Sequence, residues 1–166
     1  MNQQKTYKVL ILNGPGVAEP DALNDLDYDG ISLSDIERTC LECGEQQSLT
    51  VSFFHANDPE EVIESLKSNA ASYDALVINP IGYTKALNAD YEAYRNTTQS
   101  LANTNKPIVE VHLTNIFKLE AEVAKPLRNP EGQMAFVCGL GLSSYSIALR
   151  AIRNRLDVLS SQEGSI

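Results

Sequence analysis

The stretch that decides the fold is Lys106–Phe117, KPIVEVHLTNIF. A proline opens it, a β-branched apolar run follows, and His112 comes where that run ends. A short apolar run bounded by a proline is typical of a buried strand in a parallel sheet. Ligands of open α/β sheets bind just beyond the carboxyl ends of the strands. The residues from His112 to Asn115 are therefore the first candidates for chemistry.

Glu110 precedes His112 by two positions, so both side chains point to the same face of the predicted strand. The carboxylate is then placed to orient the imidazole. The alternative is a core histidine whose ring is capped by a backbone carbonyl, and the sequence leaves both interpretations open.

The composition argues against some classes of binding partner. The chain has 166 residues, 43% of them hydrophobic and 21% charged, which is typical of one soluble globular domain spanning residues 1–166. A net charge of −9 argues against nucleic acid and anionic membrane surfaces as partners. No apolar run approaches the roughly 20 residues that span a membrane. We expect a cytoplasmic protein.

The three cysteines give little reason to expect a metal or redox centre. Cys40 and Cys43 form a CxxC that falls within a predicted helix, and no second pair accompanies it. We therefore predict reduced, buried thiols, no metal and no cofactor.

Strands and helices alternate along the rest of the chain. Apolar runs predict strands at 7–12, 49–54, 75–78 and 134–138, in addition to the one after Pro107. Helices are predicted from about residue 32 to 47, from Pro59, around 87–101 and around 145–159. Asp58 is the predicted N-cap of the second helix and Glu61 its capping-box glutamate. Residues 17–30 are expected to form a lid-like loop, 119–133 a short helical piece and loop, and 160–166 a frayed tail.

This alternation predicts βαβ units and a parallel sheet with helices on both faces. Five strands fit a flavodoxin-like, doubly wound α/β domain with strand order 2-1-3-4-5. That order brings three segments together at one edge, namely 13–16, 79–85 and 112–115. They supply a histidine, asparagines, threonines, a lysine and backbone N–H groups, which suit proton transfer beside a developing oxyanion.

Four motifs, in order and spacing, resemble type II 3-dehydroquinase over nearly the whole chain up to about Arg153. They are Ile11-Leu12-Asn13-Gly14-Pro15, then Asn79-Pro80 with Gly82-Tyr83-Thr84, then Glu110-Val111-His112-Leu113-Thr114-Asn115-Ile116, and Gly139-Leu140-Gly141 with Tyr145.

The resemblance implies a homo-oligomer built on trimers, up to a dodecamer, and a place in the shikimate pathway. It implies anti elimination of water from 3-dehydroquinate through an enolate, without a cofactor. Tyr28 on the lid would be the base and His112, oriented by Glu110, the acid. Asn79 with the backbone of Leu113 and Thr114 would hold the substrate carboxylate, with Lys85 beside them.

The departures from the family pattern lie in the site. Gly16 stands where the family has the asparagine that holds the enolate, and Ala18 where it has the lid arginine. Lys85 stands where the family has a histidine. The family's substrate-gripping arginine falls near Val123, with Lys125 and Arg128 as the neighbouring cations.

These observations favour a dehydratase of this family with a diverged site, acting weakly or on another hydroxy-carboxylate. The alternative is a catalytically silent oligomer that binds a small carboxylate or a protein partner.

Overall fold

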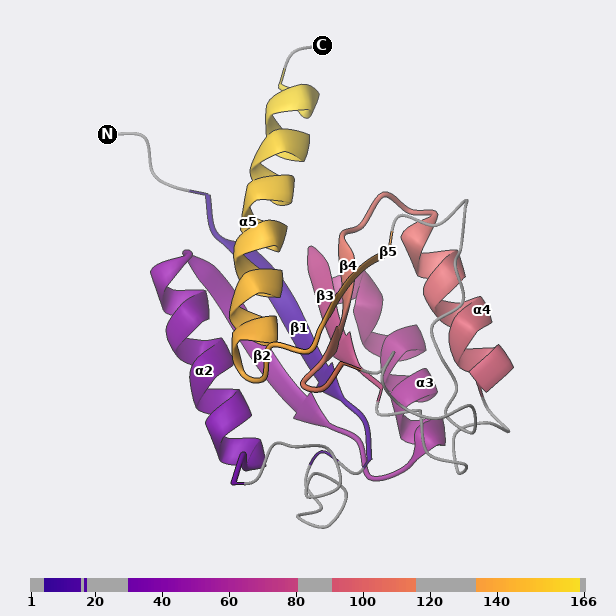
Figure 1. Ribbon diagram of the computed structural model, residues 1–166. Helices are drawn as coiled ribbons and strands as arrows, with labels where there is room; N and C mark the ends of the chain where they lie inside the picture. The colour runs from indigo at the N-terminus through magenta and orange to yellow at the C-terminus, as the bar shows by residue number, and fades with distance from the viewer. Residues whose placement is uncertain (1–4, 16, 18–29, 81–90, 116–133, 165–166) are drawn as a thin grey trace.

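The computed structural model describes residues 5–15, 17, 30–80, 91–115 and 134–164 (Figure 1). Its elements, in chain order, are β1 (Tyr7–Asn13), α2 (Leu33–Gln46), β2 (Leu49–His55), α3 (Pro59–Asn69), the 3₁₀ turn η1 (Ala70–Ser72), β3 (Ala75–Asn79), α4 (Tyr91–Ala102), β4 (Ile108–His112), β5 (Met134–Cys138) and α5 (Ser143–Glu163).

The five strands form one parallel sheet in the order β2-β1-β3-β4-β5, which confirms the predicted flavodoxin-like arrangement. In the register, Asn13 pairs with both His55 and Asn79, and His112 pairs with Cys138. The polar residues that end the strands therefore lie along one edge of the sheet.

Helices cover both faces of the sheet (Figure 1). Helices α2 and α5 pack with Val9, Val77 and Val109 in one buried cluster, and α3 and α4 pack with Leu76 and Ile108 in another. Strand residues alternate between these clusters because successive side chains point to opposite faces.

The predicted starts of helices α2 and α3 are confirmed, and their N-caps differ in detail. In α2 the Ser32 Oγ accepts from the Asp35 N–H at 3.1 Å, and the Asp35 carboxylate accepts from the Ser32 N–H at 2.9 Å. In α3 the Asp58 carboxylate accepts from the Glu61 N–H at 2.9 Å. The Glu61 carboxylate accepts from the Asn57 N–H, one residue earlier than a capping box requires.

Helix α5 continues through Glu163, into the segment predicted as a frayed tail. The extension has partners, because Lys5 Nζ donates to Ser160 Oγ at 3.2 Å and Ser161 Oγ donates to the Asp157 carbonyl at 2.8 Å. The predicted lid, apart from Val17 and Gly30, and the segment 119–133 lie outside the described residues.

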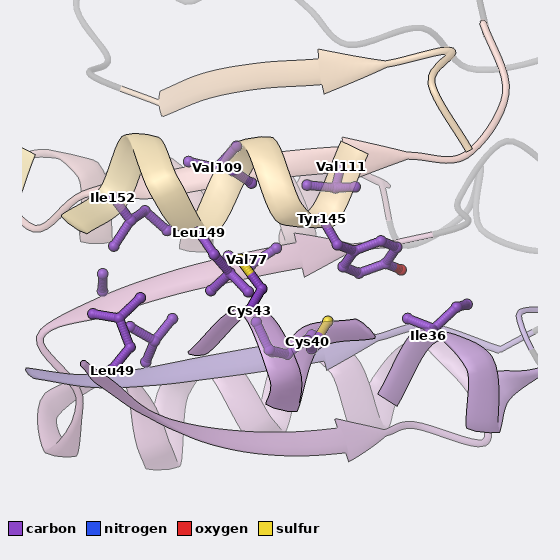
Figure 2. Packing of buried hydrophobic residues seen from close by; sticks show 14 of the residues in the cluster. Ile36, Cys40, Cys43, Leu49, Val77, Val109, Val111, Tyr145, Leu149 and Ile152 are labelled. Atoms are coloured by element: carbon purple, nitrogen blue, oxygen red, sulfur yellow. The ribbon is translucent and has the colours of Figure 1, made fainter. Parts of the chain in front are cut away.

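The cysteine prediction is confirmed for the thiols of α2, which are free and buried. Figure 2 shows Cys40 and Cys43 on the side of α2 that faces Tyr145 and Leu149 of α5, in the buried cluster that also contains Val77. Burial, then the neighbouring Cys43 and Glu37, raises the pKa of the Cys40 thiol well above its usual range. Cys40 is thus an inert core residue.

Among the described residues, none of the helices combines the length and the apolar character needed to cross a membrane.

Candidate active site

Backbone hydrogen bonds fasten the loops at the carboxyl edge of the sheet to one another. The Gly14 N–H donates to the Asn79 carbonyl at 2.7 Å, which joins the loops after β1 and β3. A Cβ on Gly14 would lie 2.2 Å from the Pro80 carbonyl oxygen, so only glycine permits this approach. The Gly139 and Gly141 N–H groups donate to the carbonyls of His112 and Leu113 at 3.2 and 3.0 Å. The loop after β5 is thereby fixed against the end of β4.

The first polar cluster of the site contains the predicted histidine and its carboxylate. His112 Nε2 lies 2.7 Å from Glu110 Oε1, and both side chains are buried. The Tyr94 hydroxyl of α4 donates to the other oxygen, Glu110 Oε2, at 2.8 Å. The His112 ring also lies against Phe136 of β5, with centroids 5.3 Å apart. The predicted contact between Glu110 and His112 is present and is made by the carboxylate.

This geometry bears on the tautomer of the ring. A carboxylate at Nε2 favours the tautomer with the proton on Nε2. Because Nε2 is engaged by Glu110, Nδ1 is the ring nitrogen that this contact does not use. An imidazole oriented by a carboxylate in this way suits general acid–base chemistry.

The second polar cluster lies on the other face of the sheet, under α5. Asn79 Nδ2 donates to the Tyr145 hydroxyl at 2.7 Å, and that hydroxyl donates to Asn13 Oδ1 at 2.5 Å. Asn13 Nδ2 in turn approaches the Phe54 carbonyl at 3.5 Å. Asn13, Asn79 and Tyr145 are each at most 2% exposed. The tyrosine thus fixes the orientation of both asparagine amides.

Burial raises the pKa of Tyr145 well above its usual value, and the hydrogen bond from Asn79 only partly offsets that effect. The hydroxyl therefore stays protonated and serves as both donor and acceptor between the two asparagines.

The structure places the other predicted residues unequally. Leu113 is buried in the core beneath α5, which leaves only its backbone for a ligand. Thr114 is half-buried just after β4. Tyr28 and Lys85 lie outside the described residues, as do the positions where the family's other charged residues would fall.

His55 is a third polar group at this edge, and no sequence pattern singled it out. It ends β2 beside Asn13, and its buried Nε2 atom has no hydrogen-bond partner among the described residues. Tyr94 fell within a predicted helix and Tyr145 within the fourth motif, and neither hydroxyl was given a role. A tyrosine hydroxyl in the apolar stripe of a helix, close to the level of the strand ends, is the signal that could have identified them.

No group of three or more His, Cys, Asp or Glu side chains that could hold a metal ion occurs in the part of the chain that the structure describes.

The comparison with known families agrees with this geometry. The family model described as "Dehydroquinase class II" matches residues 7–153. The chain belongs to the class II dehydroquinase family. The match includes both polar clusters and confirms the resemblance carried by the four sequence motifs.

Individual relatives agree with the family match. The 3-dehydroquinate dehydratase of Histophilus somni strain 2336 is 33% identical over 153 residues, covering 90% of this chain and 94% of the relative. The type II dehydroquinase of Propionibacterium acnes superposes with a TM-score of 0.73 at 23% identity, covering 89% of this chain and 97% of that one. A 3-dehydroquinate dehydratase-like protein from Bifidobacterium longum superposes with a TM-score of 0.65 at 22% identity, covering 91% and 98%. The two structural likenesses concern the fold, and the family match and the curated relative support a type II dehydroquinase-like dehydratase.

Tyr145→Phe should lower the free energy of unfolding by about 1–3 kcal/mol, because it leaves buried amide groups of Asn13 and Asn79 without a partner. Urea denaturation measures the change. Tyr7→Phe is the matched control, since the Tyr7 hydroxyl makes only two 3.3 Å contacts, with Leu156 and Asp157. A loss no larger than that of the control would contradict the role given to the Tyr145 hydroxyl.

Tyr145→Phe should also change how the free energy of unfolding depends on pH in the alkaline range. A folded-state pKa raised above the ordinary tyrosine pKa of 10.0 means that the neutral phenol of Tyr145 is favoured by folding. Its contribution is complete below that value and is lost as the pH rises through the folded-state pKa. Above about pH 10 the wild type should therefore lose stability more steeply than Tyr145→Phe.

Proposed function

We propose that this protein is a hydro-lyase that eliminates water from a hydroxy-carboxylate through an enolate, with a site diverged from that of its relatives. The observation that carries the proposal is the buried Glu110–His112 pair at the end of β4. The chain's membership of the class II dehydroquinase family supports the reaction type.

In this elimination the base removes a proton next to a carbonyl group and the enolate forms. The C–O bond to the leaving hydroxyl then breaks while His112 delivers a proton from Nδ1, so that the group departs as water. Glu110 stabilises the imidazolium before that transfer and the protonated Nε2 after it. By family resemblance Tyr28 is the base.

The divergence concerns the groups that make the base and hold the enolate. Asp27 and Asp29 flank Tyr28 in the sequence, and like charges disfavour a tyrosinate. Ala18 supplies no cation to offset them, and Gly16 supplies no side-chain donor to the enolate oxygen. Losing one such donor typically lowers a rate by about 10²–10³.

The groups proposed to hold the ligand's carboxylate lie at the ends of β3 and β4. They are Asn79, Thr114 and the backbone N–H groups after His112, with Lys85 adding a positive charge. The hydrogen bond to Tyr145 uses one N–H of the Asn79 amide and holds the group in a single orientation, which favours a ligand that matches it.

Turnover of 3-dehydroquinate should be absent or at least about 10²–10³ below that of ordinary family members, for the reasons just given. A steady-state assay that follows the enone product measures it. Where turnover is detected, His112→Ala should lower it by a further 10²–10⁴, approximately the contribution of one general acid. Ordinary family-level turnover would show that the catalytic groups have been assigned wrongly, and an unchanged rate in His112→Ala would remove His112 from the mechanism.

Small carboxylates such as citrate should bind saturably, and Asn79→Ala and Thr114→Ala should each weaken the binding. Isothermal titration measures the affinities. Thr50→Ala is the control, because Thr50 is an exposed threonine near the start of β2, at the opposite end of the strand from the site. Equal affinity in the wild type and both site variants would exclude this carboxylate site. Saturable binding without turnover of any hydroxy-carboxylate would favour the silent binding protein over the enzyme.

We also propose a homo-oligomer built on trimers, on the basis of the resemblance. The acidic net charge does not oppose assembly at physiological salt, where the Debye length is about 8 Å. Light scattering at micromolar concentration should give a mass that is a multiple of three chains. A monomer would contradict the proposal.

A further inference from the structure

We propose that Tyr94 is a positioning residue for the Glu110–His112 pair, in that its hydroxyl holds the Glu110 carboxylate in the orientation that His112 requires. This inference rests on the proposed function, in which His112 is the general acid.

The three side chains form a row from helix α4 to the end of β4. The Tyr94 hydroxyl donates to Glu110 Oε2 at 2.8 Å, and Glu110 Oε1 contacts His112 Nε2 at 2.7 Å. Tyr94, Glu110 and His112 are 3%, 2% and 4% exposed, so bulk water competes little for these contacts. Each carboxylate oxygen thus has its own protein partner.

Two hydrogen bonds to the Glu110 carboxylate prevent a rotation that one hydrogen bond would still allow. The terminal torsion of a glutamate side chain is broad, so a carboxylate held at one oxygen can still rotate about that bond. The second contact, at Oε2, fixes the plane of the group and with it the direction of the acceptor at Oε1. The imidazole orientation then follows from that of the carboxylate.

The tyrosine is itself anchored. Its ring belongs to the buried cluster that α3 and α4 form with Ile78 and Ile108. The Thr98 hydroxyl donates to the Tyr94 carbonyl at 3.0 Å, one turn further along α4. The packing of α4 on the sheet thereby sets the position of the Tyr94 hydroxyl, and through Glu110 it affects the orientation of His112.

The hydroxyl also affects the protonation state of the pair. By donating to Oε2 it stabilises the carboxylate over the carboxylic acid. Without it, the anionic pair loses a donor and takes up a proton more readily. Cys138 is the register neighbour of His112 on β5, so its thiol is a further titratable group at this end of the sheet.

Tyr94→Phe tests the proposal, because it keeps the packed ring and removes only the hydroxyl. The chain has two histidines, so NMR of the imidazole Hε1 protons gives one signal for each, and His55→Gln assigns them. In Tyr94→Phe the midpoint of proton uptake by the Glu110–His112 pair should rise by about one pH unit, the effect of losing one hydrogen bond to a carboxylate. The His55 signal should titrate as in the wild type.

Two controls separate positioning from a general loosening of the fold. Tyr7→Phe removes another buried tyrosine hydroxyl, one that contacts the end of α5, and should leave the midpoint unchanged. In a Glu110→Gln background, adding Tyr94→Phe should no longer move the His112 titration, because the hydroxyl acts through the carboxylate. An unmoved midpoint in Tyr94→Phe, an equal shift in Tyr7→Phe, or a shift that persists without Glu110 would each overturn the proposal.

Kinetics adds a readout that distinguishes this inference from the proposed function. With any substrate that is turned over, Tyr94→Phe should lower kcat about tenfold and leave KM unchanged, because Tyr94 acts on the acid and not on the ligand. A shifted midpoint in a protein that turns over nothing would preserve the positioning role and reject the enzyme. Normal turnover in Tyr94→Phe together with an unmoved midpoint would reject the positioning role alone.

Discussion

The hydrogen bond between His112 Nε2 and Glu110 Oε1 is the interaction on which the candidate site depends. A carboxylate and an imidazole buried this deeply are costly unless each satisfies the other. The pair is stable because the Tyr94 hydroxyl occupies the second carboxylate oxygen. Breaking any one of these contacts removes a buried hydrogen bond, so the requirements of the fold and of the proposed chemistry coincide at the end of β4.

This pair and the second cluster lie on opposite faces of the sheet, at its carboxyl edge. In the second cluster Tyr145 connects Asn13 with Asn79. Alternation along the strands places Glu110 and His112 toward α4, and Asn13 and Asn79 toward α5. A ligand beyond the strand ends would meet a proton-transfer group from one side and an amide from the other. Each of these groups is held by a tyrosine from a helix on its own face.

The two clusters also explain how a site can diverge without losing the fold. The residues that differ from the family pattern, Gly16, Ala18 and Lys85, follow the ends of β1 and β3 in the sequence and lie outside the described residues. In the proposed site, substitution there would change the charge and the donors offered to a ligand. Substitution of Asn13, Asn79 or Glu110 would instead remove a buried hydrogen bond, typically at about 1–3 kcal/mol. Stability therefore favours keeping the orienting groups even when the reaction changes.

By itself the sequence determined the strands, the helix starts and the strand order, because these follow from local patterns. Apolar runs, an N-cap such as Asp58 and the alternation of strands with helices each involve neighbouring residues. The pairing of Glu110 with His112 was predictable for the same reason, since a strand repeats every two residues. Two details differed. The Glu61 carboxylate accepts from the N–H of Asn57, one residue before the predicted N-cap, and the longer α5 has a contact with the distant Lys5.

Only the tertiary structure decided which side chains hold the site. Tyr94 lies 16 positions from Glu110, and Tyr145 lies 66 positions from Asn79 and 132 from Asn13. Their contacts depend on how far each helix is rotated and shifted on the sheet, and that is set by the packing of the two cores. A periodic pattern identifies the buried face of a helix, but it does not say which strand residue a given hydroxyl will meet.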